Sequence, residues 1–347
     1  MSNTTAGTVD KEIQEIYALF FDGIPVTTDV IDTSREEGDF RQAILIRDSE
    51  NKQYVLKITA NDFTFPEKIL VWQKAVKEYR DLGYYCPQIF SDKKGTFPTV
   101  KYQGHYCVVY AEEYSIYKSL EDRTACEDEG QEVDSSRYFD DIWSMTAKIA
   151  AKNLDFTDYP SAYCLFETFC PSDETDEVLE NALEWKKCAS SLPSEFSTQV
   201  EKIWEIWYKN RETIKAEYDK LPTSVFQADL NPTNLLIDEN GFFKGIYDFN
   251  LCGKDVFINY LMRENFGNYE TEIEKIFRAL EVASKYYTFS EKEKELALPL
   301  YRCLKPLWFI RLQELKDARD NREAIKSHLD RVEDYLTKDI DFKGHMS

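Results

Sequence analysis

The first third of the chain alternates apolar and polar residues in the manner of an antiparallel sheet. Between residues 40 and 114 the alternation runs through RQAILIRD, KQYVLKIT, PTVKYQ and HYCVVYAEEY, and a SEN turn joins the first two segments. Residues 65–87, FPEKILVWQKAVKEYRDLGYYCP, interrupt the series with an amphipathic helical pattern. We therefore expect a small antiparallel sheet that carries one helix.

Helical patterns dominate the remainder. YFDDIWSMTAKIAAKNL, DEVLENALEWKKCASSL and STQVEKIWEIWYKNRETIKAEYDKL lie before residue 225, and EIEKIFRALEVASKYY, EKEKELALPLYRCLKPLWFIRLQEL and REAIKSHLDRVEDYL complete the chain. Between these groups, LLID, the turn ENG and FFKGIYDF predict a β-hairpin. No repeat with a period of about 20 to 50 residues is visible.

Composition predicts a globular protein of one large or two moderate domains. The chain has 347 residues, of which 43% are hydrophobic and 14% aromatic. Its N-terminal stretch MSNTTAGTVDKEIQEI is polar, and no apolar run approaches the roughly 20 residues that span a bilayer. The eight cysteines show no CxxC pair and no zinc-ligand spacing. We expect a cytoplasmic protein with reduced cysteines and no membrane partner.

The net charge and the few histidines argue against two classes of function, nucleic-acid binding and hydrolysis by a catalytic triad. The formal charge is −21, from 64 acidic and 43 basic residues, so most of the surface would repel a nucleic acid. None of the three histidines, His105, His328 and His345, accompanies a serine or cysteine nucleophile motif. Nucleic-acid binding and triad hydrolysis are therefore not expected.

The segment VFQADLNPTNLLIDENGFFKGIYDF carries the chemistry. Asp229 and Asn234 lie five positions apart on a loop broken by Pro232, so the first can face an acceptor hydroxyl while the second turns its amide oxygen toward a metal. The hairpin then returns Asp248 beside Asn234, which closes the metal site. Each residue alone is common in turns, but DxxxxN, a hairpin and DF together indicate a phosphotransferase site.

On these residues the chain resembles the aminoglycoside phosphotransferase and choline kinase-like family, relatives of the protein kinases. The family's loop usually reads HGDLxxxNLL, and here it is QADLNPTNLL followed by IYDFN. The resemblance implies that Asp229 is the catalytic base, that Asn234 and Asp248 bind Mg²⁺, and that ATP or GTP is the donor. Gln227 replaces a histidine that mainly fixes backbone geometry, and glutamine also donates and accepts hydrogen bonds.

The resemblance also assigns residues in the sheet region. Lys57 looks like the strand lysine that holds the nucleotide phosphates. Its carboxylate partner should come from the following helix, where Glu67 and Glu78 both qualify; Glu67 is preferred because the family places this residue well ahead of GxxxP, here GYYCP. The strand CVVYAEEY resembles the hinge whose backbone holds the base, at Tyr110, Ala111 and Glu112.

Two further segments resemble family features less closely. A glycine-rich phosphate loop is nearly absent, and we assign Gly38, Asp39 and Phe40 as a nucleotide lid. LCGKDVFINYLMREN resembles the family's GDPxxDLA, with Asn259 at the last acidic position and a structural role expected for Asp255.

The predicted fold is a two-lobed, protein-kinase-like α+β fold. Residues 1–114 would form a nucleotide-binding lobe around a small antiparallel sheet, and residues 115–347 a larger, mainly helical lobe for catalysis and acceptor binding. The expected activity is Mg²⁺-dependent transfer of the γ-phosphate to a hydroxyl. No long activation segment and no APE motif follow Asp248, so we expect a small-molecule acceptor.

Acidic residues after the predicted hinge form either a solvated loop on an acidic protein or, if the segment folds toward the site, a surface that attracts a cationic acceptor. They stand near two aromatic residues that could stack on a sugar or an ammonium group. The residues are Glu121, Asp122, Glu127, Asp128, Glu129, Glu132, Asp134, Asp140 and Asp141, with Tyr138 and Trp143. An aminoglycoside or an amino alcohol would have the required charge.

Two alternatives remain open at this stage. Gln227 and the missing glycine-rich loop are also compatible with a catalytically degenerate, kinase-fold nucleotide-binding protein. A different class of protein, an acidic helical scaffold in which QADLNPTN is coincidental, would bind no nucleotide. The sequence does not choose between ATP and GTP, and it gives neither the acceptor nor the oligomeric state.

Overall fold

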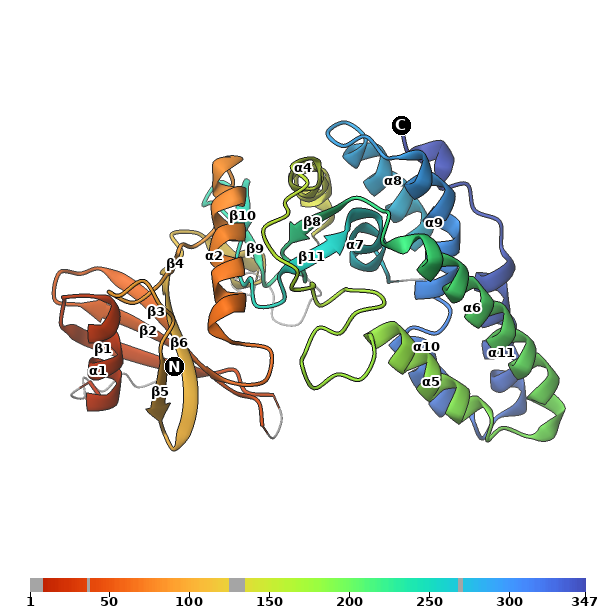
Figure 1. Ribbon diagram of the computed structural model, residues 1–347, viewed down its shortest axis with the longest axis horizontal. Coiled ribbons are helices and arrows are strands. Elements are labelled where there is room, and N and C mark those ends of the chain that lie inside the picture. Colours follow the sequence, from red (N-terminus) through yellow and green to blue (C-terminus); the bar gives the residue numbers. More distant parts are fainter. Residues whose placement is uncertain (1–8, 36–37, 125–134, 268–270) are drawn as a thin grey trace. The chain divides into compact units, whose positions relative to one another are not determined.

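The computed structural model describes residues 9–35, 38–124, 135–267 and 271–347 (Figure 1). Its contacts divide the chain into two compact units. Unit 1 comprises Met1–Ser136, Cys170–Ser172 and Asp229–Cys252. Unit 2 comprises Arg137–Phe169, Asp173–Ala228 and Gly253–Ser347. The hairpin segment with Asp229, Asn234 and Asp248 thus belongs to the same unit as the N-terminal sheet. The boundary between the two functional lobes at residue 114 stays a prediction.

Unit 1 is built on an antiparallel sheet in the order β1-β2-β3-β6-β4, with β5 also paired to β6. The strands are β1 (Pro25–Asp32), β2 (Phe40–Asp48), β3 (Gln53–Ala60), β4 (Ile89–Phe90), β5 (Thr99–Tyr102) and β6 (His105–Glu113). The predicted strand pair joined by the SEN turn is β2 and β3. The sequence pattern did not predict β1, because this edge strand is mostly exposed and lacks a buried apolar side.

Helix α1 (Lys11–Phe20) covers one face of this sheet (Figure 1). The Asp10 side chain caps the helix by accepting a hydrogen bond from the amide of Glu12, and the apolar stripe of α1 packs on β2, β3 and β6. The buried sheet residues on this face include Ile44, Leu56 and Val109. Because strand side chains alternate, Lys57 must point to the opposite face.

Helix α2 (Pro66–Asp81) lies on that opposite side of the sheet. It begins with Pro66, whose fixed φ and missing amide suit the first helical position. The ring of Trp72 meets the ring of Tyr110 edge-on at 6.0 Å, and Gln73 donates a hydrogen bond to the carbonyl of Ile89. The sheet is therefore covered by α1 on one face, while α2 borders the face that carries Lys57.

The predicted hairpin is confirmed as a pair of antiparallel strands, β9 (Leu235–Ile237) and β10 (Phe243–Ile246). A short strand, β7 (Lys118–Ser119), extends it to a three-stranded sheet and leads into helix α3 (Leu120–Thr124). The backbone of Tyr85 also binds the hairpin, because its amide donates to Lys244 and its carbonyl accepts from Ile246. These bonds fix the strand that leads to Asp248.

Gly245 is required where the hairpin approaches Tyr85. A Cβ atom at position 245 would lie 1.8 Å from the carbonyl oxygen of Tyr85. We expect Gly245→Ala to lower the free energy of unfolding by about 2 kcal/mol or more, since neither backbone can yield without losing hydrogen bonds. Chemical denaturation measures this loss. The control is Gly267→Ala, where an added Cβ meets no atom of the described residues within 4 Å. Equal stability of the two variants would contradict the prediction.

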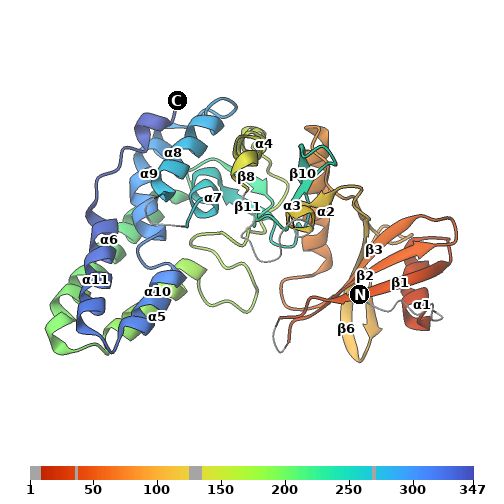
Figure 2. The ribbon, with the colours of Figure 1, turned by 180° about the vertical axis from the view of Figure 1, so that it is seen from behind.

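Unit 2 is mainly helical (Figure 2). Its helices are α4 (Phe139–Ala151), α5 (Glu177–Ala189), α6 (Ser197–Tyr218), α7 (Phe257–Glu264), α8 (Glu272–Ala283), α9 (Glu291–Leu304), α10 (Phe309–Ala318) and α11 (Arg322–Thr337). Strands β8 (Thr223–Phe226) and β11 (Gly253–Val256) pair with each other. Trp185 and Trp207 are fully buried in the helical core. Within the described residues, no helix is long and apolar enough to cross a membrane.

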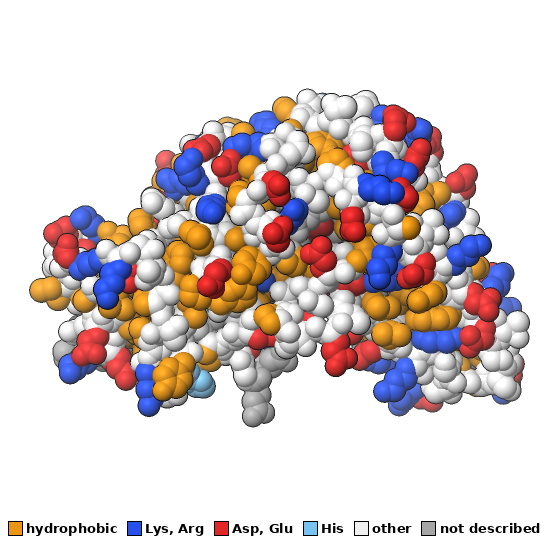
Figure 3. Space-filling view, viewed as in Figure 1, with side chains coloured by type: hydrophobic (Ala, Val, Ile, Leu, Met, Phe, Trp, Pro, Cys, Tyr) orange, Lys and Arg blue, Asp and Glu red, His pale blue; other side chains and the backbone are white. Residues whose placement is uncertain are grey.

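Charged side chains of both signs are interspersed on the face shown in Figure 3. The net charge of −21 thus accompanies many local ion pairs, such as Lys254 with Asp155 and Arg278 with Asp140. The seven cysteines within the described residues are free thiols, and five of them are buried.

Candidate active site

The two aspartates predicted for catalysis and metal binding share an unusual backbone conformation. Asp229 has φ +77° and Asp248 has φ +59°, both in the left-handed region. Side chains with a Cβ rarely adopt this region unless the surrounding structure enforces it, and such residues cluster at functional sites.

Asn234 connects these two aspartates through hydrogen bonds. Its side-chain Nδ2 donates to the backbone carbonyl of Asp229 at 2.8 Å and to Oδ2 of the same residue at 3.3 Å. Its backbone carbonyl accepts from the amide of Tyr247, the residue before Asp248, at 3.1 Å. The structure therefore brings together Asp229, Asn234 and Asp248, the three residues that the loop motif predicted.

The surroundings of Asp229 make its carboxylate a better proton acceptor. Burial raises its pKa most, and the negative charge of Asp248 acts in the same direction. Hydrogen bonds from Asn231 and Asn234 and the positive charge of Arg35 oppose this change, but the pKa remains raised. The 2.6 Å bond from Asn231 Nδ2 to Asp229 Oδ1 also fixes the orientation of the carboxylate.

Lys57 lies on β3 opposite Tyr110 of β6, on the sheet face that α1 leaves uncovered. Its Nζ forms an ion pair with Glu112 at 3.8 Å. Burial acts to lower the pKa of the Lys57 ammonium, but the charges of Glu112 and Asp248 outweigh burial and raise it. Burial raises the pKa of the Glu112 carboxyl, and Lys57 opposes that change. Lys57 is thus a fixed cation beside Asp248.

The partner of Lys57 differs from the one expected. Glu67 is exposed in the first turn of α2, and the ion pair of Lys57 is with the strand residue Glu112. Side-chain alternation explains this result, because Glu112 is two positions from Tyr110 and so shares the sheet face of Lys57. The sequence pattern contained this alternation, but the resemblance directed attention to the helix.

The backbone of Tyr110, Ala111 and Glu112, which was expected to hold the base, is paired within the sheet. Strand β6 continues to Glu113 and lies between β3 and β4, so that Ala111 pairs with Leu56 on one side and with Phe90 on the other. The backbone groups of an internal strand bind the neighbouring strands and are not available to a nucleotide base. Strand β6 ends at Glu113, so a hinge whose backbone binds the nucleotide base would have to begin at Tyr114.

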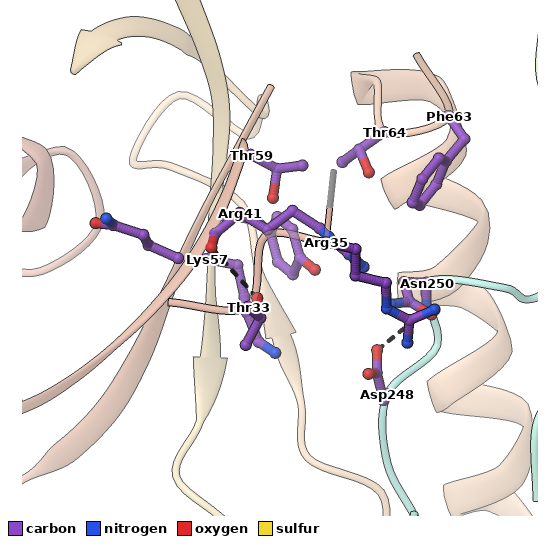
Figure 4. A pocket seen from close by; sticks show the side chains of 11 residues that line it. Thr33, Arg35, Arg41, Lys57, Thr59, Phe63, Thr64, Asp248 and Asn250 are labelled. Carbon is purple, nitrogen blue, oxygen red and sulfur yellow. Dashed lines mark hydrogen bonds between the residues drawn. The ribbon is translucent and has the colours of Figure 1, made fainter. Parts of the chain in front are cut away.

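A cavity of about 230 Å³ lies next to Lys57 (Figure 4). The cationic side chains of Arg35, Arg41 and Lys57 line it together with Asp248 and Asn250. Three threonines add hydroxyl groups to its wall, namely Thr33, Thr59 and Thr64. All of these residues belong to unit 1. A cavity with several cations and hydroxyl groups suits a ligand that carries phosphate groups.

The residues expected to form a nucleotide lid have other contacts. Asp39 forms an ion pair with Arg41, and the ring of Phe40 stacks on His105 with the centroids 4.5 Å apart. Gly38 is exposed and has φ +91°, and residues 36 and 37 lie outside the described part of the chain. Asp39 and Phe40 therefore anchor the start of β2.

Asn234 and Asp248 offer oxygen ligands that fit Mg²⁺. Because Nδ2 of Asn234 is bound to Asp229, the amide oxygen is directed elsewhere, and the hydroxyl of Thr233 is 3.4 Å from it. The described residues contain no cluster of three or more His, Cys, Asp or Glu side chains suited to a metal ion. Mg²⁺ needs no such cluster, since it commonly takes one or two protein oxygens and completes its shell with substrate phosphates and water.

Gln227 and Asp255, which flank the motif in the sequence, form hydrogen bonds that hold the backbone of unit 2 in place. The carbonyl of the fully buried Gln227 accepts a 2.7 Å hydrogen bond from the hydroxyl of Tyr260. Asp255 accepts hydrogen bonds from Ser161, from Asn259 and from the amide of Val256. Burial raises the pKa of Asp255 to about 6. These contacts agree with the structural role expected for Asp255.

The acidic segment after the sheet is less available to a ligand than expected. Tyr138 and Trp143 are buried, and Trp143 packs edge-on against Tyr260 within unit 2. Asp140 forms an ion pair with Arg278. Glu127, Asp128, Glu129, Glu132 and Asp134 lie outside the described residues. Glu121 and Asp122 are exposed on α3, and Asp141 is exposed on α4. The amide of Glu121 donates to the carbonyl of Pro232 in the motif loop.

The fold is that of a kinase-like phosphotransferase. It combines the geometry of the motif loop, the strand lysine Lys57, a sheet in unit 1 and a mainly helical unit 2. The chain belongs to the phosphotransferase enzyme family, whose model matches residues 36–258, more than half of its length. This match shows that the motif is not a coincidence in an acidic scaffold, so that alternative is wrong. The predicted two-lobed α+β fold class is confirmed.

Solved structures of similar fold include three kinases of small molecules. The amicoumacin kinase hAmiN in complex with AMP-PNP, Ca²⁺ and Ami is 12% identical, with a TM-score of 0.53 and 97% of each chain covered. The macrolide 2'-phosphotransferase MphH from Brachybacterium faecium is 10% identical, with a TM-score of 0.48 and coverage of 95% of this chain and 98% of that one. The ethanolamine kinase from Plasmodium vivax is 11% identical, with a TM-score of 0.42 and coverage of 92% and 79%. No curated protein matches the chain.

Proposed function

We propose that this protein is a Mg²⁺-dependent kinase that transfers the γ-phosphate of ATP or GTP to a hydroxyl group of a small molecule. The observation that carries the proposal is the hydrogen-bonded arrangement of Asp229, Asn234 and Asp248, with Lys57 beside Asp248. Family membership supports the same class of reaction.

Each residue has a role that follows from its surroundings. Lys57, fixed by Glu112, binds the α- and β-phosphate oxygens of the donor. Asp229, with its raised pKa and its orientation fixed by Asn231, accepts the proton of the attacking hydroxyl and positions its oxygen. Asn234 and Asp248 would hold Mg²⁺, which would neutralise charge on the phosphate oxygens. Positioning and charge neutralisation then account for most of the rate increase.

The acceptor that fits the charges near this loop is a cation. Glu121 and Asp122 are exposed acids on α3, next to the loop that carries Asp229. Burial raises the pKa of Tyr247 to about 12, and the charges of Asp248 and Asp122 act in the same direction while Lys57 opposes them. An amino alcohol or an aminoglycoside would place an ammonium group near these carboxylates.

The test is a screen of nucleotide consumption with ATP and with GTP. The acceptor panel should contain aminoglycosides, amino alcohols, macrolides and neutral sugars. We expect cationic acceptors to be phosphorylated fastest and their KM values to rise with ionic strength, because salt screens exposed charges beyond about 10 Å. Neutral acceptors that outperform every cationic one, or KM values indifferent to salt, would disprove the cationic acceptor while leaving the kinase assignment in place.

A second candidate function is nucleotide binding without transfer, which Gln227 in place of the usual histidine favours. The 2.7 Å bond from Tyr260 to the Gln227 carbonyl holds the backbone before the loop, and this contact favours an active enzyme. Calorimetry together with the turnover assay distinguishes the two functions. Stoichiometric Mg²⁺-nucleotide binding with no turnover on any acceptor would establish the binding protein.

A further inference from the structure

Arg41 of β2 lies on the same sheet face as Lys57. Arg41 pairs with Thr59, and Ala43 pairs with Lys57, so both cations stand on neighbouring strands with their side chains directed to one side. Both line the cavity shown in Figure 4. The positive charge of Arg41 also acts to lower the pKa of Lys57, which shows that the two side chains are close enough to interact.

The guanidinium of Arg41 is held in place before any ligand binds. It forms a 2.7 Å ion pair with Asp39, and Nδ2 of Asn61 donates to the same carboxylate at 3.2 Å. The guanidinium also lies over the ring of Phe63, 5.9 Å from its centroid. Only 14% of the Arg41 side chain is exposed. An arginine so constrained loses little further conformational entropy when it binds a ligand.

Part of this guanidinium is buried without a hydrogen-bond acceptor. Within the described part of the chain, Nε of Arg41 has no such partner. A buried donor in this state carries a desolvation penalty that an incoming acceptor oxygen would remove. The Asp39 carboxylate contacts NH2 of the guanidinium, so it leaves further N–H donors for a ligand.

The segment before β2 lacks the usual backbone groups that bind phosphate, and the cation of Arg41 can take their place. It contains one glycine, Gly38, and so lacks the row of glycines whose amides would surround a phosphate. Arginine can replace such amides, because its planar fork binds two phosphate oxygens at once. The hydroxyl groups of Thr59 and Thr64 line the same cavity and can donate to phosphate oxygens beside it.

We propose that Arg41 is a phosphate-binding residue that forms, together with Lys57, a two-cation clamp for the polyphosphate of the donor nucleotide. This inference rests on the proposed function, because it assumes a nucleoside triphosphate as the ligand. Arg41 binds terminal phosphate oxygens from the side of the sheet, and Asp39 keeps its guanidinium pointed at them. The clamp recognises the phosphates whatever the base.

Calorimetric titrations with Mg²⁺ test the clamp. The ligands are the non-hydrolysable triphosphates AMP-PNP and GMP-PNP and the monophosphates AMP and GMP. We expect Arg41→Gln to weaken binding of the preferred triphosphate about 10- to 100-fold, the usual range for a hydrogen-bonded charge pair, and to change binding of its monophosphate less than threefold. Arg41→Lys should restore part of the loss, because it keeps the charge without the fork.

The control is Arg47→Gln, which removes an exposed arginine of the same strand that lies outside this cavity. It should bind both ligands as the wild type does. Thermal unfolding of all variants checks folding. If Arg41→Gln does not fold, Arg41→Lys carries the test, because it keeps the charge without the fork and should weaken triphosphate binding more than monophosphate binding. Unchanged triphosphate affinity in Arg41→Gln, or equal losses for triphosphate and monophosphate, would overturn the inference. Absence of triphosphate binding by the wild type would instead remove the proposed function.

Discussion

Asp229→Asn should lower kcat by about 10²- to 10⁴-fold and leave the affinity for Mg²⁺-nucleotide nearly unchanged. The amide cannot accept the proton of the acceptor hydroxyl, but it keeps the size of the side chain. Its oxygen can still accept the hydrogen bond from Asn231, and asparagine tolerates the left-handed conformation at φ +77°. The loss should therefore appear in the chemical step and not in folding. Steady-state kinetics combined with calorimetry separates the two.

Asp238→Asn is the matched control for this variant. Asp238 lies in the turn of the same hairpin, where it forms an ion pair with Lys244 and accepts hydrogen bonds from the amides of Asn240 and Phe242. Its replacement removes a carboxylate from the hairpin but not from the loop that carries Asp229, so kcat should stay near the wild-type value. A near-normal rate for Asp229→Asn would remove that residue from its proposed role.

Asp248→Ala should abolish the effect of Mg²⁺ on nucleotide binding. The loss of a carboxylate ligand should weaken Mg²⁺-nucleotide binding at least about 10- to 100-fold, the range seen when only an outer partner of a metal site is removed. We expect the wild-type affinity to fall on chelation of Mg²⁺ and the affinity of the variant to be low and indifferent to chelation. Titrations with and without EDTA give both values.

A second substitution separates metal binding from backbone strain. Asp248 has φ +59°, a conformation that costs alanine more than asparagine. Asp248→Asn keeps the side-chain shape and should fold as the wild type does, yet it offers a neutral amide oxygen in place of a carboxylate. If both variants bind nucleotide as tightly as the wild type when Mg²⁺ is present, Asp248 is not a metal ligand.

The spatial placement of Asp229, Asn234 and Asp248 that the sequence predicted depends on short-range spacing. Asp229 and Asn234 are five residues apart, and the hairpin that returns Asp248 is marked by its own turn. Local patterns of this kind contain most of the information needed to place their residues.

The contacts that were not predicted depend on strands distant in the sequence. Glu112 lies beside Lys57 because β3 and β6 pair in one register, and the backbone of Ala111 is occupied because β4 adds to the other side of β6. The hydrophobic pattern of a strand sets which face of the sheet each side chain occupies, but it does not show which distant strand becomes the neighbour. Arg41, in contrast, could have been placed beside Lys57, because the SEN turn predicts the pairing of β2 with β3.

The burial of Trp143 could have been predicted. In α4, Trp143 stands among Ile142, Met145 and Ile149, which are also buried. An apolar series with helical spacing usually marks the side of a helix that faces a core. The nearby acids favoured an interpretation as a ligand surface, whereas this spacing favoured a core.

The division of the chain into units has a consequence for synthesis of the protein. Unit 1 begins at the N-terminus but needs Asp229–Cys252 for the hairpin that pairs with β7 and binds Tyr85. At about 5 to 20 residues per second, a ribosome that has made residue 136 needs on the order of ten seconds to reach residue 252. The nascent sheet must wait through this interval with the backbone groups of β7 and Tyr85 unpaired. Chaperone binding to ribosome-bound chains should accordingly be strongest between these two lengths and decline once the hairpin has emerged.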